Sequence, residues 1–139
     1  MAKSIEIYDV IPNIFSRDTQ PSIIGIKIPL ETDFSINWKR GELIFRVEDE
    51  ITSEITFTNT YMTDAVLVGI LVNDINYTAS ATEERNIDVY VAGWFLGPVI
   101  FDLQPEDTQE WLSDQATAQG LSSPYSQTLI NTIILEVGT

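Results

Sequence analysis

Two residue types that carry much of enzyme chemistry are absent from this sequence of 139 residues. There is no histidine, so the usual general base near neutral pH and the commonest transition-metal ligand are both missing. There is no cysteine, which excludes thiolate catalysis, disulfides and metal sites built on sulfur. The seven glycines are scattered and form neither a phosphate-binding loop nor a nucleophile elbow. Although paired carboxylates, as in glycoside hydrolases, leave one route to catalysis open, the sequence predicts no enzyme activity and no cofactor.

Two short acidic segments contain the oxygen ligands that a hard cation such as calcium prefers. Asp74 and Asn76 stand at alternate positions of an expected turn, and Glu48-Asp49-Glu50 places three carboxylates in a row. Neither segment has the length, the glycine or the terminal glutamate of the twelve-residue calcium loop. Because Asn and Asp tolerate turn geometry well, we expect turns here and no metal site.

Aromatic rings beside hydrogen-bonding side chains are the ingredients of a carbohydrate site. Four rings, those of Trp38, Tyr77, Tyr90 and Trp94, have Asn or Asp nearby in the sequence. In a small β domain such rings are more often core or interface residues. The candidate ligand or partner contacts are Trp38, Asp74, Asn76, Tyr77, Tyr90 and Trp94.

The charge balance argues against several classes of partner. Twenty-one acidic residues against seven basic ones give a formal net charge of -14, which repels nucleic-acid phosphates and anionic lipid. We therefore expect no direct binding to nucleic acid or membrane. Carboxylates spaced like phosphates can instead mimic nucleic acid, but here they gather only locally, at 48–50, 83–84 and 106–110. A solvated surface is the expected reading, and mimicry is a third alternative.

Two further features bear on localisation. The first residues lack the basic start, the apolar stretch and the cleavage site of a signal peptide, and Glu6 and Asp9 interrupt them. The apolar runs at 65–72 and 94–101 are well short of the roughly 20 residues that a membrane-spanning helix requires. We expect a cytoplasmic protein at synthesis.

Short segments rich in β-branched residues predict that most of the chain forms strands. Residues 34–38 and 43–47 are expected to form a hairpin across the turn Lys39-Arg40-Gly41. Pro98 cannot donate to a strand ladder and indicates an edge, a bulge or a break. The expected strands cover 3–11, 23–28, 34–38, 43–47, 51–58, 65–72, 87–91, 94–101 and 128–137.

The clearest alternation of apolar and polar residues lies at 51–58. Ile51, Ile55 and Phe57 alternate with polar side chains, which is the pattern of a strand with one wet face. We expect Ile55 and Phe57 in the core, with Glu54 and Thr56 in water.

One helix is predicted, at 105–118. Pro105 suits the first helical position, the acidic residues that follow complement the positive end of the helix dipole, and Gly120 can end the helix in a left-handed conformation. The expected inner face consists of Trp111, Leu112, Gln115 and Ala116.

Many strands, short polar turns and one late helix predict a single, mainly β domain over residues 1–139. With 44% apolar and 20% charged residues the composition is that of a globular domain with one core. An antiparallel β-sandwich or a jelly-roll-like domain is favoured over a parallel α/β sheet, which needs a helix between most strands.

Three predicted strands, at 65–72, 94–101 and 129–135, place apolar groups on both faces, whereas a strand of an antiparallel sandwich normally has one wet face. One short helix cannot cover them all, so we expect subunit contacts; the alternative is central strands under the helix and loops. The sequence thus favours a non-enzymatic structural or assembly protein with protein partners. We expect a homo-oligomer, for example a component of a virion or another particle, with a lectin-like β-sandwich as the alternative.

Overall fold

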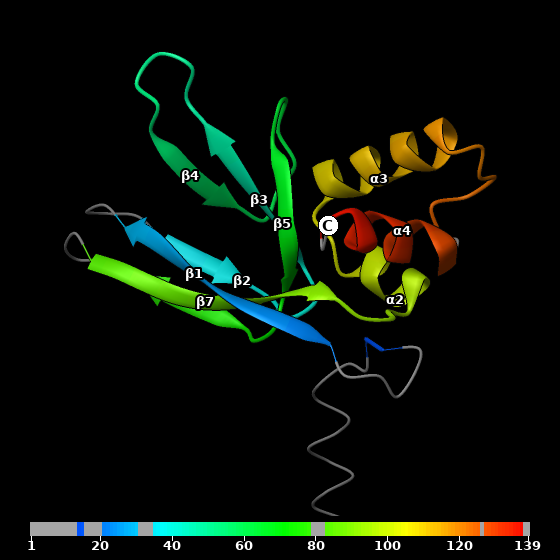
Figure 1. Ribbon diagram of the computed structural model, residues 1–139, viewed down its shortest axis with the longest axis horizontal. Helices are drawn as coiled ribbons and strands as arrows, with labels where there is room; N and C mark the ends of the chain where they lie inside the picture. Colours follow the sequence, from blue (N-terminus) through cyan, green and yellow to red (C-terminus); the bar gives the residue numbers. More distant parts are fainter. Residues whose placement is uncertain (1–13, 16–20, 31–34, 79–82, 126, 138–139) are drawn as a thin grey trace, which may run out of the picture.

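The computed structural model describes residues 14–15, 21–30, 35–78, 83–125 and 127–137. The strand expected at 3–11 lies outside these residues. Within them the chain forms seven strands and three helices, numbered as in Figure 1.

The strands form two antiparallel sheets. A five-stranded sheet has the order β1-β7-β5-β3-β4, and a two-stranded sheet pairs β2 with β6. This arrangement confirms a mainly β, antiparallel fold; the sandwich or jelly-roll type is not confirmed, and the sheets are not closed. The strands are β1 (Ser22–Leu30), β2 (Ser35–Trp38), β3 (Leu43–Glu48), β4 (Ile55–Thr58), β5 (Val66–Leu71), β6 (Ile75–Thr78) and β7 (Glu83–Ala92).

Three short helices, α2 (Gly97–Asp102), α3 (Glu106–Ala118) and α4 (Gln127–Val137), lie together on one side of β5 (Figure 1). Helix α3 confirms the helix predicted at 105–118. Pro105 is its N-cap residue, and Gly120 follows its end with a φ of 74°. Leu112 and Ala116 of the expected inner face are buried, together with Thr108.

The strand predicted at 94–101 is wrong, because α2 occupies most of this run. Pro98 lies in the first turn of the helix, where a missing backbone N–H costs nothing. Ile100 and Phe101 are buried in the core. A run of eight apolar residues has no periodicity that separates a buried strand from a buried helix.

The strand predicted at 128–137 is also wrong, because these residues form most of α4. The prediction followed the β-branched residues of this segment, but Leu129, Ile130, Ile133 and Ile134 recur at helical spacing and are all buried. Packing of this apolar face overrides the weak local preference for a strand.

The expected hairpin between 34–38 and 43–47 does not form. The turn between them exists, since the Glu42 N–H donates to the Lys39 carbonyl O over 3.1 Å. However, β2 pairs with β6, whereas β3 pairs with β4 and β5. The turn carries the chain from one sheet to the other, so that the sequence locates the turn but not the partners of its strands.

The strand predicted at 51–58 begins later than expected. Ile51 is 94% exposed, and Ser53 has a left-handed φ of 61°. Strand β4 starts only at Ile55, so the first half of the alternation belongs to the turn between β3 and β4. Within β4 the predicted faces are only partly met: Thr56 is exposed, but Phe57 is half-buried.

Two apolar cores lie on the two faces of the five-stranded sheet. The first contains Phe45, Ile70 and Tyr90 with the apolar faces of the helices. The second lies against β2, with Ile36 and Trp38 packed against strands of the larger sheet. Neighbouring residues of β5 enter different cores, Ile70 the first and Leu71 the second. The run at 65–72 is therefore apolar on both faces because β5 is a central strand between two cores.

The five-stranded sheet bends where β5 meets β7. These strands pair only through Ile70 with Tyr90 and Leu71 with Val89 in the described residues. A Cβ atom on Gly69 would lie 2.6 Å from the Tyr90 carbonyl O, so that the two backbones approach as closely as glycine allows. The bend also brings Cα atoms of the edge strands β1 and β4 within 8 Å of each other.

Candidate interaction surface

Two of the predicted contact residues lie in the cores. Trp38, at the end of β2, is 6% exposed and belongs to the second core. Tyr90 of β7 is 5% exposed and packs on Phe15 and Phe95, with ring centroids 5.2 and 5.8 Å away. These two rings present little surface to a ligand and serve mainly to pack the fold.

Three other predicted residues lie near Trp38, around the sheet formed by β2 and β6. Asp74 precedes β6, and its Oδ1 accepts a hydrogen bond of 2.6 Å from the Arg40 backbone N–H. Asn76 is exposed on β6 opposite Asn37, and Tyr77 stands opposite Ile36, with its side chain outside the description. Asp74 thus links the turn between β2 and β3 to the turn between β5 and β6.

Trp94 is separate from that group and lies two residues after the end of β7. It is 41% exposed and precedes the buried Phe95. The structure therefore divides the six predicted contacts between the β2–β6 sheet and the end of β7, and it does not gather them into one site.

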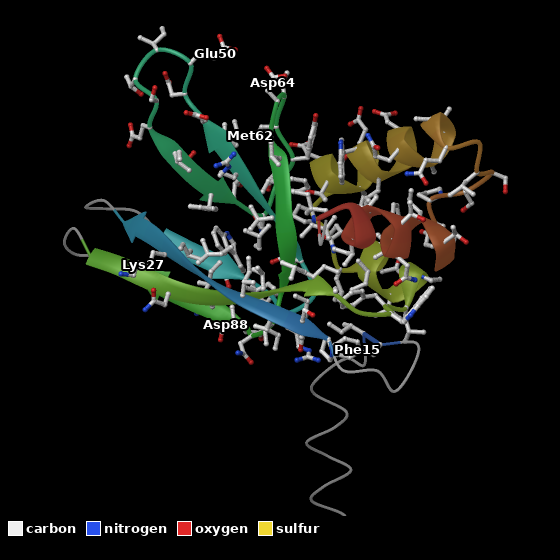
Figure 2. All side chains as sticks on the ribbon, viewed as in Figure 1. Phe15, Lys27, Glu50, Met62, Asp64 and Asp88 are labelled. Carbon is white, nitrogen blue, oxygen red and sulfur yellow. The ribbon has the colours of Figure 1, made fainter. Side chains whose placement is uncertain are left out.

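The acidic segments have structural roles in their turns. Asp49 accepts hydrogen bonds from the backbone N–H groups of Ile51 and Thr52 at 2.8 and 2.9 Å, and these bonds lower the pKa of Asp49. Figure 2 places Glu50 in the turn between β3 and β4 and Asp88 well away from it. In the described part of the chain, no three Asp or Glu residues are grouped to hold a metal ion.

Glu42 is a buried carboxylate that the sequence reasoning missed. It is 6% exposed; one oxygen accepts a hydrogen bond from the Lys39 backbone N–H and the other from Asn59 Nδ2. Burial raises the pKa of Glu42, although both hydrogen bonds act in the opposite direction. In the sequence, the one indication that Glu42 is buried is its position directly before the apolar run Leu43-Ile44-Phe45. Its carboxylate links the turn between β2 and β3 to Asn59.

The surface with the clearest capacity to bind is the outer edge of β1. Among the described residues no strand pairs with this edge. Ile23 and Ile24 on the strand are 50% and 45% exposed. An unpaired strand edge presents backbone donors and acceptors to another chain, and exposed apolar side chains add area to such a contact.

The other edge strand, β4, is protected in ways that β1 is not. Strand β4 has only four residues, the turn before it carries Asp49, Glu50 and Glu54, and Glu48 of β3 pairs with its first residue. Strand β1 has nine residues and no carboxylate. Short length and flanking charge are common means of blunting a sheet edge, as are the Lys27 and Pro29 that β1 contains. Strand β1 is the longer of the two edges and the one with exposed isoleucines.

Comparisons with known proteins do not indicate a function. No protein-family model, curated protein or solved structure matches the chain. In the described residues no helix is long and apolar enough to cross a membrane.

Proposed function

We propose that this chain is a non-enzymatic structural or assembly protein that self-associates through protein–protein contacts, for example as a component of a larger particle such as a virion. The observation that carries the proposal is the long outer edge of β1 with the exposed Ile23 and Ile24. The three segments that the sequence predicts as two-faced strands do not support it. Two of those segments are helices, and β5 packs against both cores except at Val66, its first residue, which is 54% exposed.

Strand addition explains how such an edge would bind. An added strand supplies hydrogen bonds to the backbone, and side chains on alternate positions supply specificity. The predicted sandwich type belongs to the same proposal, since β2 and β6 face the larger sheet across the second core. Among the described residues no strand is hydrogen-bonded to the outer edge of β1, although Cα atoms of β4 approach β1 within 8 Å.

The mass in solution tests this function. Sedimentation or light scattering at micromolar concentration should give a dimer or a larger species, whose proportion falls on dilution. The variant Ile24→Lys should shift the population toward monomer, because a charged side chain at a sheet edge opposes strand pairing. The matched control is Thr56→Lys, which adds the same charge to the other edge strand. A monomer at every concentration would refute self-association.

Two of the rings on which the lectin-like alternative depends, those of Trp38 and Tyr90, are buried in the cores. Trp94, at 41% exposed, is its remaining described platform. Specific signals on a glycan array, lost in Trp94→Ala, would favour this alternative over self-assembly.

One observation supports the acidic nucleic-acid mimic as an alternative. The segment 97–137, which contains all three described helices, has six carboxylates and no lysine or arginine. Four of these carboxylates lie exposed on α3, namely Glu106, Asp107, Glu110 and Asp114. Tight binding to a DNA-binding protein, lost at high salt, would favour this alternative.

A further inference from the structure

We infer that the five-stranded sheet has a hinge where β5 meets β7, and that its two ribbons, β1–β7 and β4–β3–β5, swing about this point. In the closed position β4 shields part of the outer edge of β1, and in the open position the whole edge is free. The structure shows the closed position.

The two edge strands lie close together along a seam on one side of the molecule (Figure 1). Strands β1 and β4 stand at opposite ends of the strand order and no ladder joins them, yet some of their Cα atoms lie within 8 Å of each other. Neighbouring strands are roughly 4.8 Å apart, so that a strand inserted between β1 and β4 would need a gap of about 9.6 Å. Where β4 lies opposite β1, a further strand can therefore enter only after the two edges separate.

The ladder between β5 and β7 is the shortest in this sheet. Strands β1 and β7 pair over nine residues, and β3 pairs with β4 and with β5 over four each, whereas β5 and β7 pair over two. One further hydrogen bond of 3.0 Å runs from the Val72 N–H to the Asp88 carbonyl O. From Asp88 toward Glu83, β7 pairs with β1 alone. The hydrogen bond between Val72 and Asp88 thus lies at the end of the ladder from which the β1–β7 ribbon extends, where a swing of that ribbon breaks it first.

The second core is dense at the hinge and thin at the seam. Leu71 and Val89, where β5 meets β7, are fully buried in this core. Ile26 of β1 and Phe57 of β4 pack against the same core but are only half-buried. Separation of the edges therefore exposes side chains that already contact water, and leaves the packing at the hinge in place.

The hinge has a consequence for assembly, which rests on the proposed self-association. Strand β4 has four residues and β1 has nine, so that β4 lies opposite only part of the β1 edge. In the closed position the same chain shields this part. In the open position the whole edge presents its backbone groups to another strand. Association along all of β1 then follows opening of the seam.

Hydrogen exchange at two neighbouring amides tests the hinge. The Val72 N–H donates across the hinge to Asp88. The Leu71 N–H donates over 2.9 Å to the Glu42 carbonyl O, within the β4–β3–β5 ribbon. After correction for intrinsic rates, Val72 should exchange at least about tenfold faster than Leu71, because opening of the hinge breaks only the first of these bonds. Equal protection of the two amides, with the same dependence on denaturant, would overturn the hinge.

A covalent link across the seam supplies the control. Gly25→Cys and Thr56→Cys in one chain place a thiol on each edge strand at exposed positions, and the chain has no other cysteine. Gly25 accepts a side chain, since a Cβ atom there would meet Asp88 Oδ1 no closer than 3.6 Å. A short bismaleimide linker between the thiols should slow exchange at Val72 to the level of Leu71. The same double variant with both thiols capped by N-ethylmaleimide should keep the fast exchange.

The outcomes separate the hinge from self-association, because exchange and linking are properties of a single chain. Failure of the linker to join the two thiols, or exchange at Val72 that the linker leaves unchanged, would overturn the hinge. A monomer in solution with fast exchange at Val72 would refute the proposed self-association alone. An oligomer with equal protection at Val72 and Leu71 would refute the hinge alone.

Discussion

The side-chain amide of Asn131 on α4 pairs with both backbone groups of Phe95. The Phe95 N–H donates to Asn131 Oδ1 over 2.7 Å, and Asn131 Nδ2 donates to the Phe95 carbonyl O over 3.1 Å. Both residues are buried. The amide supplies hydrogen bonds of the kind that a neighbouring strand would give, at the point where the chain leaves β7 for the helices.

Replacement of Asn131 by leucine should destabilise the fold by about 2–6 kcal/mol, because it leaves a buried N–H and a buried carbonyl without these partners, at about 1–3 kcal/mol each. Urea denaturation measures the loss. The control is Asn86→Leu, the same change at an exposed position of β7, which should cost under about 0.5 kcal/mol. Equal costs at the two positions would show that the pairing with Phe95 contributes nothing.

Gly69→Ala should cost about 1–3 kcal/mol or more, because the new methyl group would overlap the Tyr90 carbonyl O and the Val89 side chain, at 2.6 and 2.9 Å. The matched control is Gly25→Ala, whose methyl group meets nothing closer than 3.6 Å. Thermal melts at fixed protein concentration should separate the two variants. A harmless Gly69→Ala would mean that β5 and β7 can move apart at their crossing without loss.

Glu42 should give the stability a defined pH dependence. Because burial raises its pKa in the folded chain above the ordinary value of 4.5, the folded state binds this proton more tightly than the unfolded state. The contribution of Glu42 to stability is therefore greatest below 4.5 and falls as pH rises through the raised pKa. Glu42→Gln lacks this loss, so that its stability relative to the parent chain should increase from pH 4.5 upward.

Denaturant melts from pH 3 to pH 8 measure that difference. Asp49→Asn is the control of opposite sign: its folded pKa is lowered from 3.8, so that the stability due to Asp49 is present above 3.8 and disappears as pH falls through the lowered pKa. Parallel curves for Glu42→Gln and the parent chain above pH 4.5 would contradict the role of burial.

Phe57→Ala should cost about 2 kcal/mol. This value is below the roughly 3–5 kcal/mol of a fully buried phenylalanine, because Phe57 is only half-buried against the second core. Glu54→Gln, at an exposed position, should cost under about 0.5 kcal/mol. Reversible urea melts compare the two. A greater loss from Glu54→Gln would place Glu54 in a contact between subunits.

The elements that sequence reasoning located are those with a local physical signal. Helix α3 has a proline at its start, acids in its first turn and a glycine after its end, and all three act within the segment itself. Strand β7 alternates at residues 86–89 because Asn86 and Asp88 are exposed whereas Ile87 and Val89 are buried. Such signals do not depend on the rest of the chain.

The features that it missed depend on distant partners. Ile133 and Ile134 favour a strand by themselves, and only the first core makes them helical. The partner of β2 lies beyond three other strands in the sequence, at β6. Burial of Trp38 and Tyr90 follows from the same long-range packing, which is why two predicted contact residues are core residues.

The pairing of β1 with β7 also means that β1 stays unpaired during synthesis until β7 has been made. Ile26 pairs with Ile87, so that β1 emerges from the ribosome about sixty residues ahead of its partner, a delay of about 3 to 12 seconds at 5–20 residues per second. Throughout that interval this strand, which has five isoleucine or leucine residues, lacks its partner β7. Lys27 and Pro29, which both oppose strand association, therefore protect the nascent chain before any sheet exists.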